Sequence, residues 1–335
     1  MATYKEIYGS TIEVVTSDPE NPVEGQVWYN STDNLVKGEV FQAAAWATGG
    51  SLNTARAYLA GMGTQTAAIV TGGWAGDGAA DPSGDGQTES YNGTSWTEVN
   101  DLNTNRSQVG AAGIQTSAVA FGGNTGTIPS STRNSVTNNE SWNGTSWTEV
   151  GDLNTGKRNG GNSGVDNTSA LAFGGTNNSD SSVAETESWN GTSWTEVNDL
   201  NTAKGSSGSN GTQTSALYYG GFSTVRTGIT ESWNGTSWTE VNDLGGARYG
   251  LSAAGTQTAA LAFGGNNLGP LFTQTESWNG TNWTEVADLS TARNDLAGAG
   301  ADNTSALAVG GYSGTVLAST EEWSKTEVTT DLGVS

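Results

Sequence analysis

The sequence predicts an all-β fold built from six similar four-stranded sheets, and three observations predict it. A Gly-Gly pair recurs at intervals of 44 to 52 residues, at 72–73, 122–123, 174–175, 220–221, 264–265 and 310–311. Each pair ends a short apolar run such as SAVAFGG (117–123). A phrase close to ESWNGTSWTEV, as at 140–150, begins ten to seventeen residues after the pair in most units. Self-similarity of this length is the signature of an architecture made of repeated modules.

Each unit supplies four strands. The Gly/Ala-rich stretch, such as SQVGAAG (107–113), predicts the first strand, and the alternating apolar run before Gly-Gly predicts the second. The third and fourth strands are the Trp-, Thr- and Val-rich segments on either side of Asn-Gly, since Asn-Gly is the strongest short hairpin signal. The Asn-Gly-Thr phrases also match the glycosylation sequon, but their recurrence at one hairpin position favours turns.

Four strands in about 50 residues form one blade of a β-propeller. The Gly-Gly pair followed by an aromatic residue and then Trp resembles the kelch repeat over residues 41–328. This resemblance implies a six-bladed kelch-like propeller with four antiparallel strands per blade. Most units have Trp where kelch repeats usually have Tyr, which argues against close kinship with cellular kelch proteins. The positions with Trp are Trp142, Trp189, Trp233 and Trp278, and Tyr91 keeps the usual residue.

The two ends of the repeat array predict how the ring closes. The stretch from Trp46 to Arg56 matches an outer strand and its exit loop, with no unit before it. We therefore expect residues 41–48 to supply the outer strand of the last blade, which removes an exposed sheet edge. In the alternative, Thr326–Val328 supply that strand. The predicted domains are residues 1–40 and a propeller of residues 41–335.

Residues 1–40 differ in composition from the repeats and predict a short β-hairpin. QVWYN (26–30) and NLVKGEV (34–40) flank a polar Ser-Thr-Asp turn. The phrase Gly25-x-x-Trp28-Tyr29-Asn-Ser-Thr32 is similar to segments near the start of bacteriophage tail-fibre and other virion proteins. The resemblance implies an element that attaches the propeller to other virion proteins, with Trp28 and Tyr29 as its contacts. The alternative is a small cap packed on the propeller.

The composition excludes several classes of function. The chain has no Cys and no His, which removes thiolate nucleophiles, imidazole bases and the usual transition-metal ligands. The net charge of -22 makes nucleic acids and anionic membranes poor partners. Since the sequence also lacks an apolar run long enough for a signal peptide or a membrane span, we expect no membrane insertion. We expect no cofactor.

Most acidic residues recur with the repeat. The Glu of Glu-Ser, the Glu of Thr-Glu-Val and the Asp of Asp-Leu return in nearly every unit, which predicts a charged and solvated rim. No pair of carboxylates stands out as the acid and base of a glycosidase. Three Asp residues spaced evenly among Gly in one loop form a candidate Ca²⁺ site without the EF-hand spacing. They are Asp77, Asp81 and Asp85.

One basic residue per unit stands in the loop between the outer strand and the next inner strand. The six are Arg56, Arg106, Arg158, Lys204, Arg248 and Arg293. The topology places them on one face near the axis, where they are predicted to line a mouth rich in hydrogen-bond donors. This arrangement resembles kelch domains, in which basic residues at the start of the inner strand often line the ligand-binding mouth. In the alternative, they pair with the neighbouring aspartates Asp101, Asp152, Asp199, Asp243 and Asp288.

The same face is predicted to carry the loops that vary most between units, and binding usually resides on such loops. They hold four aromatic residues, Trp74, Phe222, Phe272 and Tyr312. Aromatic rings beside polar groups suit sugar recognition, since a pyranose has an apolar face and a polar edge. In the alternative, these aromatics pack against the next blade.

The sequence therefore predicts a non-enzymatic bacteriophage virion protein that recognises host surface glycan through its variable loop face. Its expected location is the virion, after assembly in the host cytoplasm, with other virion proteins as partners of the N-terminal segment. The first alternative is a structural or decorating virion protein that packs on capsid or tail neighbours. The second is a glycan-degrading enzyme, which would have only Asp, Glu, Tyr, Lys or Arg for acid and base chemistry.

Overall fold

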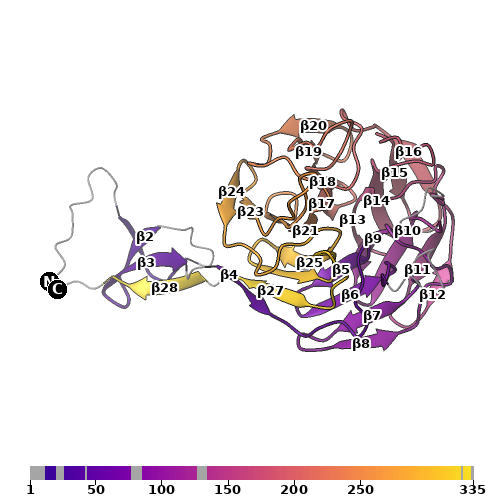
Figure 1. Cartoon of the computed structure of the whole chain (residues 1–335). Helices are drawn as coiled ribbons and strands as arrows, with labels where there is room; N and C mark the ends of the chain where they lie inside the picture. Colours follow the sequence, from indigo (N-terminus) through magenta and orange to yellow (C-terminus); the bar gives the residue numbers. More distant parts are fainter. Residues whose placement is uncertain are drawn as a thin grey trace. The chain divides into compact units, whose positions relative to one another are not determined.

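The computed structural model describes residues 12–19, 26–41, 44–76, 85–126, 134–325 and 327–332. Over these ranges the chain contains strands and turns and no helix. The strands form seven four-stranded sheets. The chain divides into two compact units: Met1–Ala44 with Lys325–Ser335, and Ala45–Ser324. Six of the sheets belong to the larger unit, and Figure 1 shows them arranged around a common centre.

The six sheets of the larger unit, here called sheets I to VI, follow each other along the chain. Sheet I consists of β5 (Ala60–Thr64), β6 (Ala67–Thr71), β7 (Thr88–Tyr91) and β8 (Trp96–Val99). Sheet II consists of β9 (Gly110–Ile114), β10 (Ser117–Phe121), β11 (Asn139–Trp142) and β12 (Trp147–Glu149). Sheet III consists of β13 (Gly161–Asp166), β14 (Ser169–Phe173), β15 (Thr186–Trp189) and β16 (Trp194–Val197). Sheet IV consists of β17 (Gly208–Thr212), β18 (Ser215–Tyr219), β19 (Thr230–Trp233) and β20 (Trp238–Val241). Sheet V consists of β21 (Ser252–Gly255), β22 (Ala260–Phe263), β23 (Thr275–Trp278) and β24 (Trp283–Val286). Sheet VI consists of β25 (Ala297–Asp302), β26 (Ser305–Val309), β27 (Thr320–Ser324) and β4 (Ala45–Thr48). Every pairing within these sheets is antiparallel.

The first strands of the six sheets are the inner strands, and they form a closed ring. Each contacts the next, from β5 through β9, β13, β17, β21 and β25, and β25 contacts β5. Small residues permit this approach. A Cβ on Gly61 would lie 2.6 Å from the carbonyl oxygen of Gly298, and a Cβ on Gly298 would lie 2.1 Å from that of Ala253. Glycine is therefore required where adjacent inner strands nearly touch.

Tryptophan fills the wider space between neighbouring sheets. Trp142 and Trp147 face each other across β11 and β12, with ring centroids 5.2 Å apart. Both are buried in one cluster with Met62 and Ile69 of sheet I. The indole nitrogen of Trp147 donates to the Thr88 hydroxyl of sheet I, 3.2 Å away. Trp147 thus joins two sheets by apolar packing and by a hydrogen bond, whereas Trp142 packs on sheet I and donates to the carbonyl oxygen of Gln115 within its own sheet.

Sheet VI combines the two ends of the larger unit. Its outer strand, β4, pairs with β27 in a register that sets Trp46 opposite Trp323. The predicted segment, 41–48, thus contains this strand. The alternative with Thr326–Val328 as the outer strand is not what the structure contains, because Glu327–Asp331 form β28 and pair with β3 (Leu35–Phe41).

The smaller unit is one sheet with the order β1 (Glu13–Val15), β2 (Val27–Asn30), β3 and β28. β2 and β3 form the antiparallel hairpin around residues 31–34, and β1 pairs with β2 in parallel. The predicted domain boundary needs correction, because residues 325–335 belong to this unit and not to the propeller. The physical reason is that β28 pairs with the otherwise open edge of β3.

Candidate functional site

The loops that enter the inner strands carry the basic residue that recurs in each repeat, and the structure buries it. The side chains of Arg56, Arg106 and Arg248 are fully buried. Each guanidinium pairs with the Glu of the third strand of the sheet that the loop enters. The Arg–Glu distances are 2.8 Å for Arg56 and Glu89, 2.9 Å for Arg106 and Glu140, and 3.1 Å for Arg248 and Glu276; Arg293 pairs with Glu321 in the same way.

Each of these carboxylates also fixes the loop backbone. Glu140 accepts hydrogen bonds from the backbone N–H of Asn103 at 2.7 Å and from its side-chain amide at 2.8 Å. Burial lowers the pKa of Arg106, and the nearby charge of Glu140 opposes that shift. The arrangement is a structural staple that ties the exit loop of one sheet to the third strand of the next.

The predicted basic mouth is therefore wrong for these residues. Buried side chains paired with glutamate cannot present donors to a ligand. The alternative pairing with aspartate is wrong too, because Asp101 accepts the backbone N–H of Thr88 at 3.0 Å instead. The glutamates of the Glu-Ser phrase, predicted on a solvated rim, are buried, whereas those of Thr-Glu-Val are exposed. The buried set is Glu89, Glu140, Glu187, Glu231, Glu276 and Glu321.

In sheet III, the basic residue that pairs with the glutamate is one position earlier in the sequence than predicted. Lys157, not Arg158, occupies the staple position, and its Nζ lies 3.2 Å from Glu187. Arg158 stands one place later, where it donates to the Ser135 hydroxyl at 2.6 Å and pairs with Asp180. The side chain of Arg158 is also buried, so it lines no mouth.

Lys204 is the staple residue of sheet IV. Its ammonium donates to the carbonyl oxygen of Ile229 at 2.6 Å and lies 4.9 Å from the centre of the Tyr218 ring. Burial lowers the pKa of Lys204 to about 8, against the raising effect of the Glu231 charge. Lys204 is fully buried, so it also lines no mouth.

Two residues after each staple position, the chain contributes one residue to a ring around the axis. No sequence pattern predicted this ring. The six residues, here called the axial ring, all have positive φ and are Tyr58, Gln108, Asn159, Ser206, Gly250 and Asp295. Each backbone N–H donates to the carbonyl oxygen of the ring residue in the preceding sheet, and the N–H of Tyr58 donates to Asp295. The six distances range from 2.7 to 3.0 Å. One closed circle of hydrogen bonds thus joins all six sheets.

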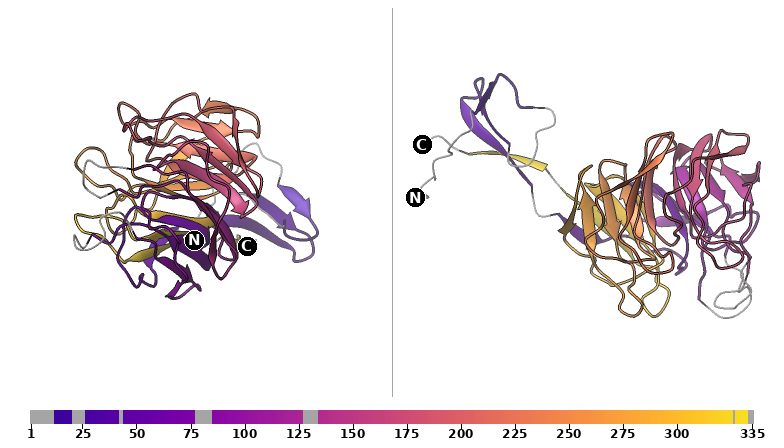
Figure 2. Two further views of the ribbon diagram at one scale, coloured as in Figure 1. Left: turned by 90° about the vertical axis from the view of Figure 1, so that its right-hand side faces the viewer. Right: turned by 90° about the horizontal axis from the view of Figure 1, so that it is seen from above.

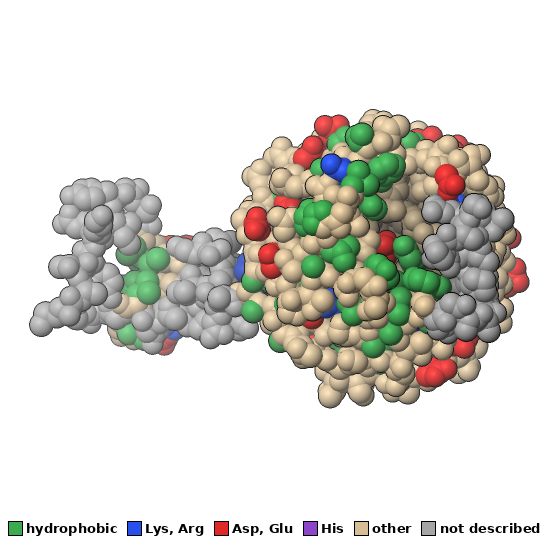
Figure 3. All heavy atoms as spheres, viewed as in Figure 1, with side chains coloured by type: hydrophobic (Ala, Val, Ile, Leu, Met, Phe, Trp, Pro, Cys, Tyr) green, Lys and Arg blue, Asp and Glu red, His purple; other side chains and the backbone are tan. Residues whose placement is uncertain are grey.

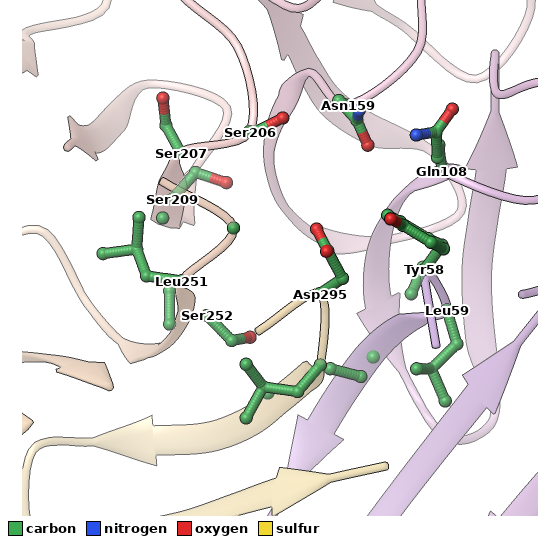
Figure 4. Close-up of a pocket in the computed structure, with 18 of the residues that line it drawn as sticks. Tyr58, Leu59, Gln108, Asn159, Ser206, Ser207, Ser209, Leu251, Ser252 and Asp295 are labelled. Carbon is green, nitrogen blue, oxygen red and sulfur yellow. The ribbon is translucent and has the colours of Figure 1, made fainter. Parts of the chain in front are cut away.

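A polar pocket of about 120 Å³ lies at this ring (Figure 4). The axial ring residues line it, together with deeper residues of the inner strands such as Ser209 and Ser252. The Asp295 carboxylate points into its middle. Burial raises the pKa of Asp295 to about 7, although a hydrogen bond from Tyr58 opposes the shift. The Oε1 atom of Gln108 is buried and has no hydrogen-bond partner among the described residues.

The long connections between second and third strands open on the same face as the axial ring. Isolated bridges, such as Ala57 to Trp74, join these connections to the loops that enter the inner strands. We call this side the loop face; Figure 2 shows the connections extending from one side of the larger unit. Figure 3, which looks onto it, shows hydrophobic side chains near the centre and acidic ones towards the edge.

The four predicted aromatic residues lie on the loop face with different exposure. Trp74 is half-buried, and its ring centroid lies 6.5 Å from that of Tyr58 in the axial ring. Phe222 is 37% exposed and contacts Tyr249, with centroids 5.9 Å apart. Phe272 and Tyr312 are half-buried. The structure therefore brings Trp74 next to the pocket and leaves Phe222 the most open of the four.

The structure describes only some of the residues of the two other predicted sites. Asp77 and Asp81 of the candidate Ca²⁺ loop lie outside the described residues, whereas Asp85 is described. No group of three or more acidic side chains suited to a metal occurs in the ranges that the structure describes. Trp28, predicted as an attachment contact, is fully buried and donates to Asp18 at 2.9 Å, so it belongs to the core of the smaller unit. Tyr29 is half-buried and donates to Asn34.

Comparison with known proteins supports the fold. No family model matches the chain, and no curated protein matches its sequence. Among solved structures, "Structure of YjhT" superposes with a TM-score of 0.67 at 13% sequence identity, covering 83% of this chain and 99% of that chain. Over the part of the chain described here, no helix is long and apolar enough to cross a membrane. The chain thus contains a β-propeller, shared with YjhT at the level of the fold alone.

Proposed function

We propose that the protein is a non-enzymatic binding module whose six-bladed, kelch-like propeller recognises a surface glycan with the loop face. The pocket of the axial ring, with the Tyr58 and Trp74 pair beside it, is the observation that carries this proposal. A sugar ring has an apolar face that stacks on aromatics and a polar edge that hydrogen-bonds. The pocket offers hydroxyl, amide and carboxylate groups next to two aromatic rings.

The contrast between the two faces supports the same assignment. On the opposite face, the Asn-Gly turns repeat one geometry. Asn143, for example, accepts from the backbone N–H of Thr145 and of Ser146, both at 2.9 Å, and Asn190 does the same in sheet III. On the loop face, the axial ring has six different residues in six otherwise similar loops. Diversity at a fixed backbone position suits selection for a ligand.

A glycan array tests the proposal. Wild-type protein is compared with Trp74→Ala and with a matched control, Ile114→Ala, which removes a 45% exposed apolar side chain from the opposite face. We expect Trp74→Ala to weaken binding about tenfold or more, because aromatic contacts contribute strongly to such sites. We expect Ile114→Ala to bind like wild type. Equal loss in both variants, or binding to no glycan by the folded wild type, contradicts the proposal.

A second candidate function is a structural virion role in which the loop face packs on a neighbour. Three exposed apolar side chains on adjacent loops favour it: Phe222, and Val225 and Leu268, each 67% exposed. Exposed apolar groups that gather in one region often mark a protein interface. If a structure of the assembled particle shows these three residues buried against another protein, the glycan proposal fails.

The pocket supports binding better than glycan hydrolysis. Among the described residues that line it, Asp295 is the one carboxylate. Glycosidases of both stereochemical types use two carboxyl groups on either side of the scissile bond.

The virion location rests on the resemblance of the segment from Gly25 to Thr32 to phage virion proteins. We propose that the smaller unit attaches the propeller to a virus particle. Removal of residues 1–36 is expected to abolish incorporation into particles and to leave glycan binding by the larger unit intact. Normal incorporation of the truncated protein would refute the attachment role.

A further inference from the structure

We propose that the axial pocket binds the protonated amino group of its ligand, so that the protein selects amino sugars over neutral sugars and rejects anionic ones. This inference rests on the proposed function and specifies the chemistry of its central site. It is carried by the pocket's charge, by its hydrogen-bonding capacity and by the space that Gly250 leaves.

The charge of the pocket disfavours anions. Asp295 lies at its centre, and no Lys or Arg is among the described residues that line it. The seven basic residues of the nearby loops are buried and not available to the pocket: six form staples with glutamate or backbone partners, and Arg158 pairs with Ser135 and Asp180. A carboxylate or phosphate placed here would lose its hydration without gaining a cationic partner.

The hydrogen-bonding groups favour a ligand that donates. The Asp295 carboxylate accepts one hydrogen bond from Tyr58 and has further acceptor positions. Asn159 and Ser206 come from the next two ring positions and also face the pocket. An ammonium group has three donors and a positive charge, so it can donate to the Asp295 carboxylate and still donate to oxygen atoms of the neighbouring ring side chains.

Gly250 makes room for the carboxylate and for the incoming group. It is the one ring position without a side chain, and its φ is +62°. A Cβ at this position would lie 3.1 Å from an Asp295 carboxylate oxygen. The glycine therefore keeps one side of the carboxylate open, and a pocket of about 120 Å³ admits a small polar head group rather than a whole oligosaccharide.

The titration of Asp295 gives the site a pH dependence. Tyr58 contacts the carboxylate, and Tyr249, itself close to Arg226, also interacts with its charge; among the described residues, these are the titratable and charged groups that the electrostatics connect with Asp295. Burial raises the pKa of Tyr249, so this group stays neutral in this pH range. Lys204, with a pKa of about 8, is buried in its staple and does not line the pocket, so Asp295 is the lining group that changes charge near neutrality. A cation binds the ionised form, and its affinity should rise from pH 6 to pH 8.

The test uses the full-length protein and isothermal titration with three matched sugars: a hexose, the corresponding 2-amino-2-deoxyhexose and the corresponding hexuronic acid. Methylammonium serves as a fourth ligand because, like a lysine side chain, it stays protonated from pH 6 to pH 8. Asp295→Asn keeps the side-chain shape and suits a positive φ. Glu240→Gln removes the same charge from an exposed strand position and is the matched control.

We expect the amino sugar to bind about tenfold more tightly than the hexose, the difference made by one charged hydrogen bond. We expect the hexuronic acid not to bind. Asp295→Asn should abolish the preference and the pH dependence of methylammonium binding, whereas Glu240→Gln should retain both. Equal affinity for the amino sugar and the hexose, or an unchanged preference in Asp295→Asn, overturns the inference.

The two proposals fail in different ways. If the hexose and the amino sugar bind equally and Trp74→Ala weakens both, glycan binding stands and the ammonium site is refuted. If no sugar binds but methylammonium binds wild type and not Asp295→Asn, the ammonium site stands and the glycan proposal is refuted.

Discussion

The buried ion pairs show how one residue type can be misjudged from its place in a repeat. Arg106 follows an Asp-Leu-Asn-Thr phrase in a loop, where a charged side chain is expected at the surface. In the structure its guanidinium also donates to the carbonyl oxygens of Gly122 and Asn138, both at 2.8 Å. Loop carbonyls and Glu140 thus surround it completely. These partners are 16 to 34 residues away, so no local pattern reveals them.

Arg106→Ala should destabilise the larger unit by about 3–5 kcal/mol, because it leaves the Glu140 carboxylate buried without its partner. Urea denaturation followed by tryptophan fluorescence measures the change. Glu149→Gln, an exposed position in the same sheet, should change stability by less than about 0.5 kcal/mol. A mild effect of Arg106→Ala, together with altered glycan binding, would return this residue to the role of a ligand contact.

Asp295 should make the stability of the larger unit depend on pH. Its pKa is raised to about 7 in the folded protein, above the value of about 3.9 for an exposed aspartate, so the folded state holds the proton more tightly. The stability associated with this group is therefore greatest at acidic pH and is lost as the pH rises from about 4 to about 7.

Urea denaturation of wild type and Asp295→Asn at pH 5 and pH 8 measures this contribution. The free energy of unfolding of wild type, relative to the variant, should fall between the two pH values. An equal pH trend in the two proteins would show that the carboxylate titrates at its ordinary pH, and an opposite trend would show that folding lowers its pKa.

At the scale of the strands, sheet II differs from the other sheets at the first residue of its third strand. In sheets I, III and IV the first residue of the third strand is Thr, whose hydroxyl accepts from a tryptophan of the following sheet, as Thr186 does from Trp238 at 3.1 Å. In sheet II that position is Asn139. The indole nitrogen of Trp194 and the Oδ1 atom of Asn139 are both buried, without hydrogen-bond partners in the described ranges.

Asn139→Thr should therefore stabilise the protein by about 1 kcal/mol, because it provides the missing acceptor for Trp194. Thermal or urea unfolding measures the gain. The reverse change at an equivalent position, Thr186→Asn, should cost a similar amount by orphaning Trp238. Destabilisation by Asn139→Thr would mean that the hydrogen bond from Asn139 to the carbonyl oxygen of Gly151 contributes more to stability than a new hydrogen bond to Trp194.

Sequence patterns predict the strands far better than they predict the site. The Gly-Gly spacing and the Asn-Gly turns are local signals, so the four strands of each unit can be placed from them. The staple residue of sheet III cannot, because Lys157 and Arg158 are adjacent and either one satisfies the pattern. The axial ring is hidden for a different reason: its six residues share a backbone conformation and no chemical type. The sequence signal that could have revealed the axial ring is that the residue two places after each staple position differs in all six repeats.

At the scale of the whole larger unit, closure depends on contacts that no single repeat contains. β25 packs on β5, and β4 completes sheet VI, so the last sheet joins the first. The axial ring adds a backbone hydrogen bond from Tyr58 to Asp295 across the same junction, at 2.8 Å. A repeat array that contacts only its neighbours can open at either end, whereas a closed ring must break at two junctions at once. The pocket exists because the ring is closed.

Amide hydrogen exchange of the axial ring tests this closure most directly. The six amides lie close to the solvent-facing pocket, and their protection depends on the circle of hydrogen bonds. The closed ring predicts that the amides of Tyr58, Gln108, Asn159, Ser206, Gly250 and Asp295 exchange slowly and with similar protection. Rapid exchange at Tyr58, with slow exchange at the other five, would contradict closure and would describe an open array with a free junction between the first and last sheets.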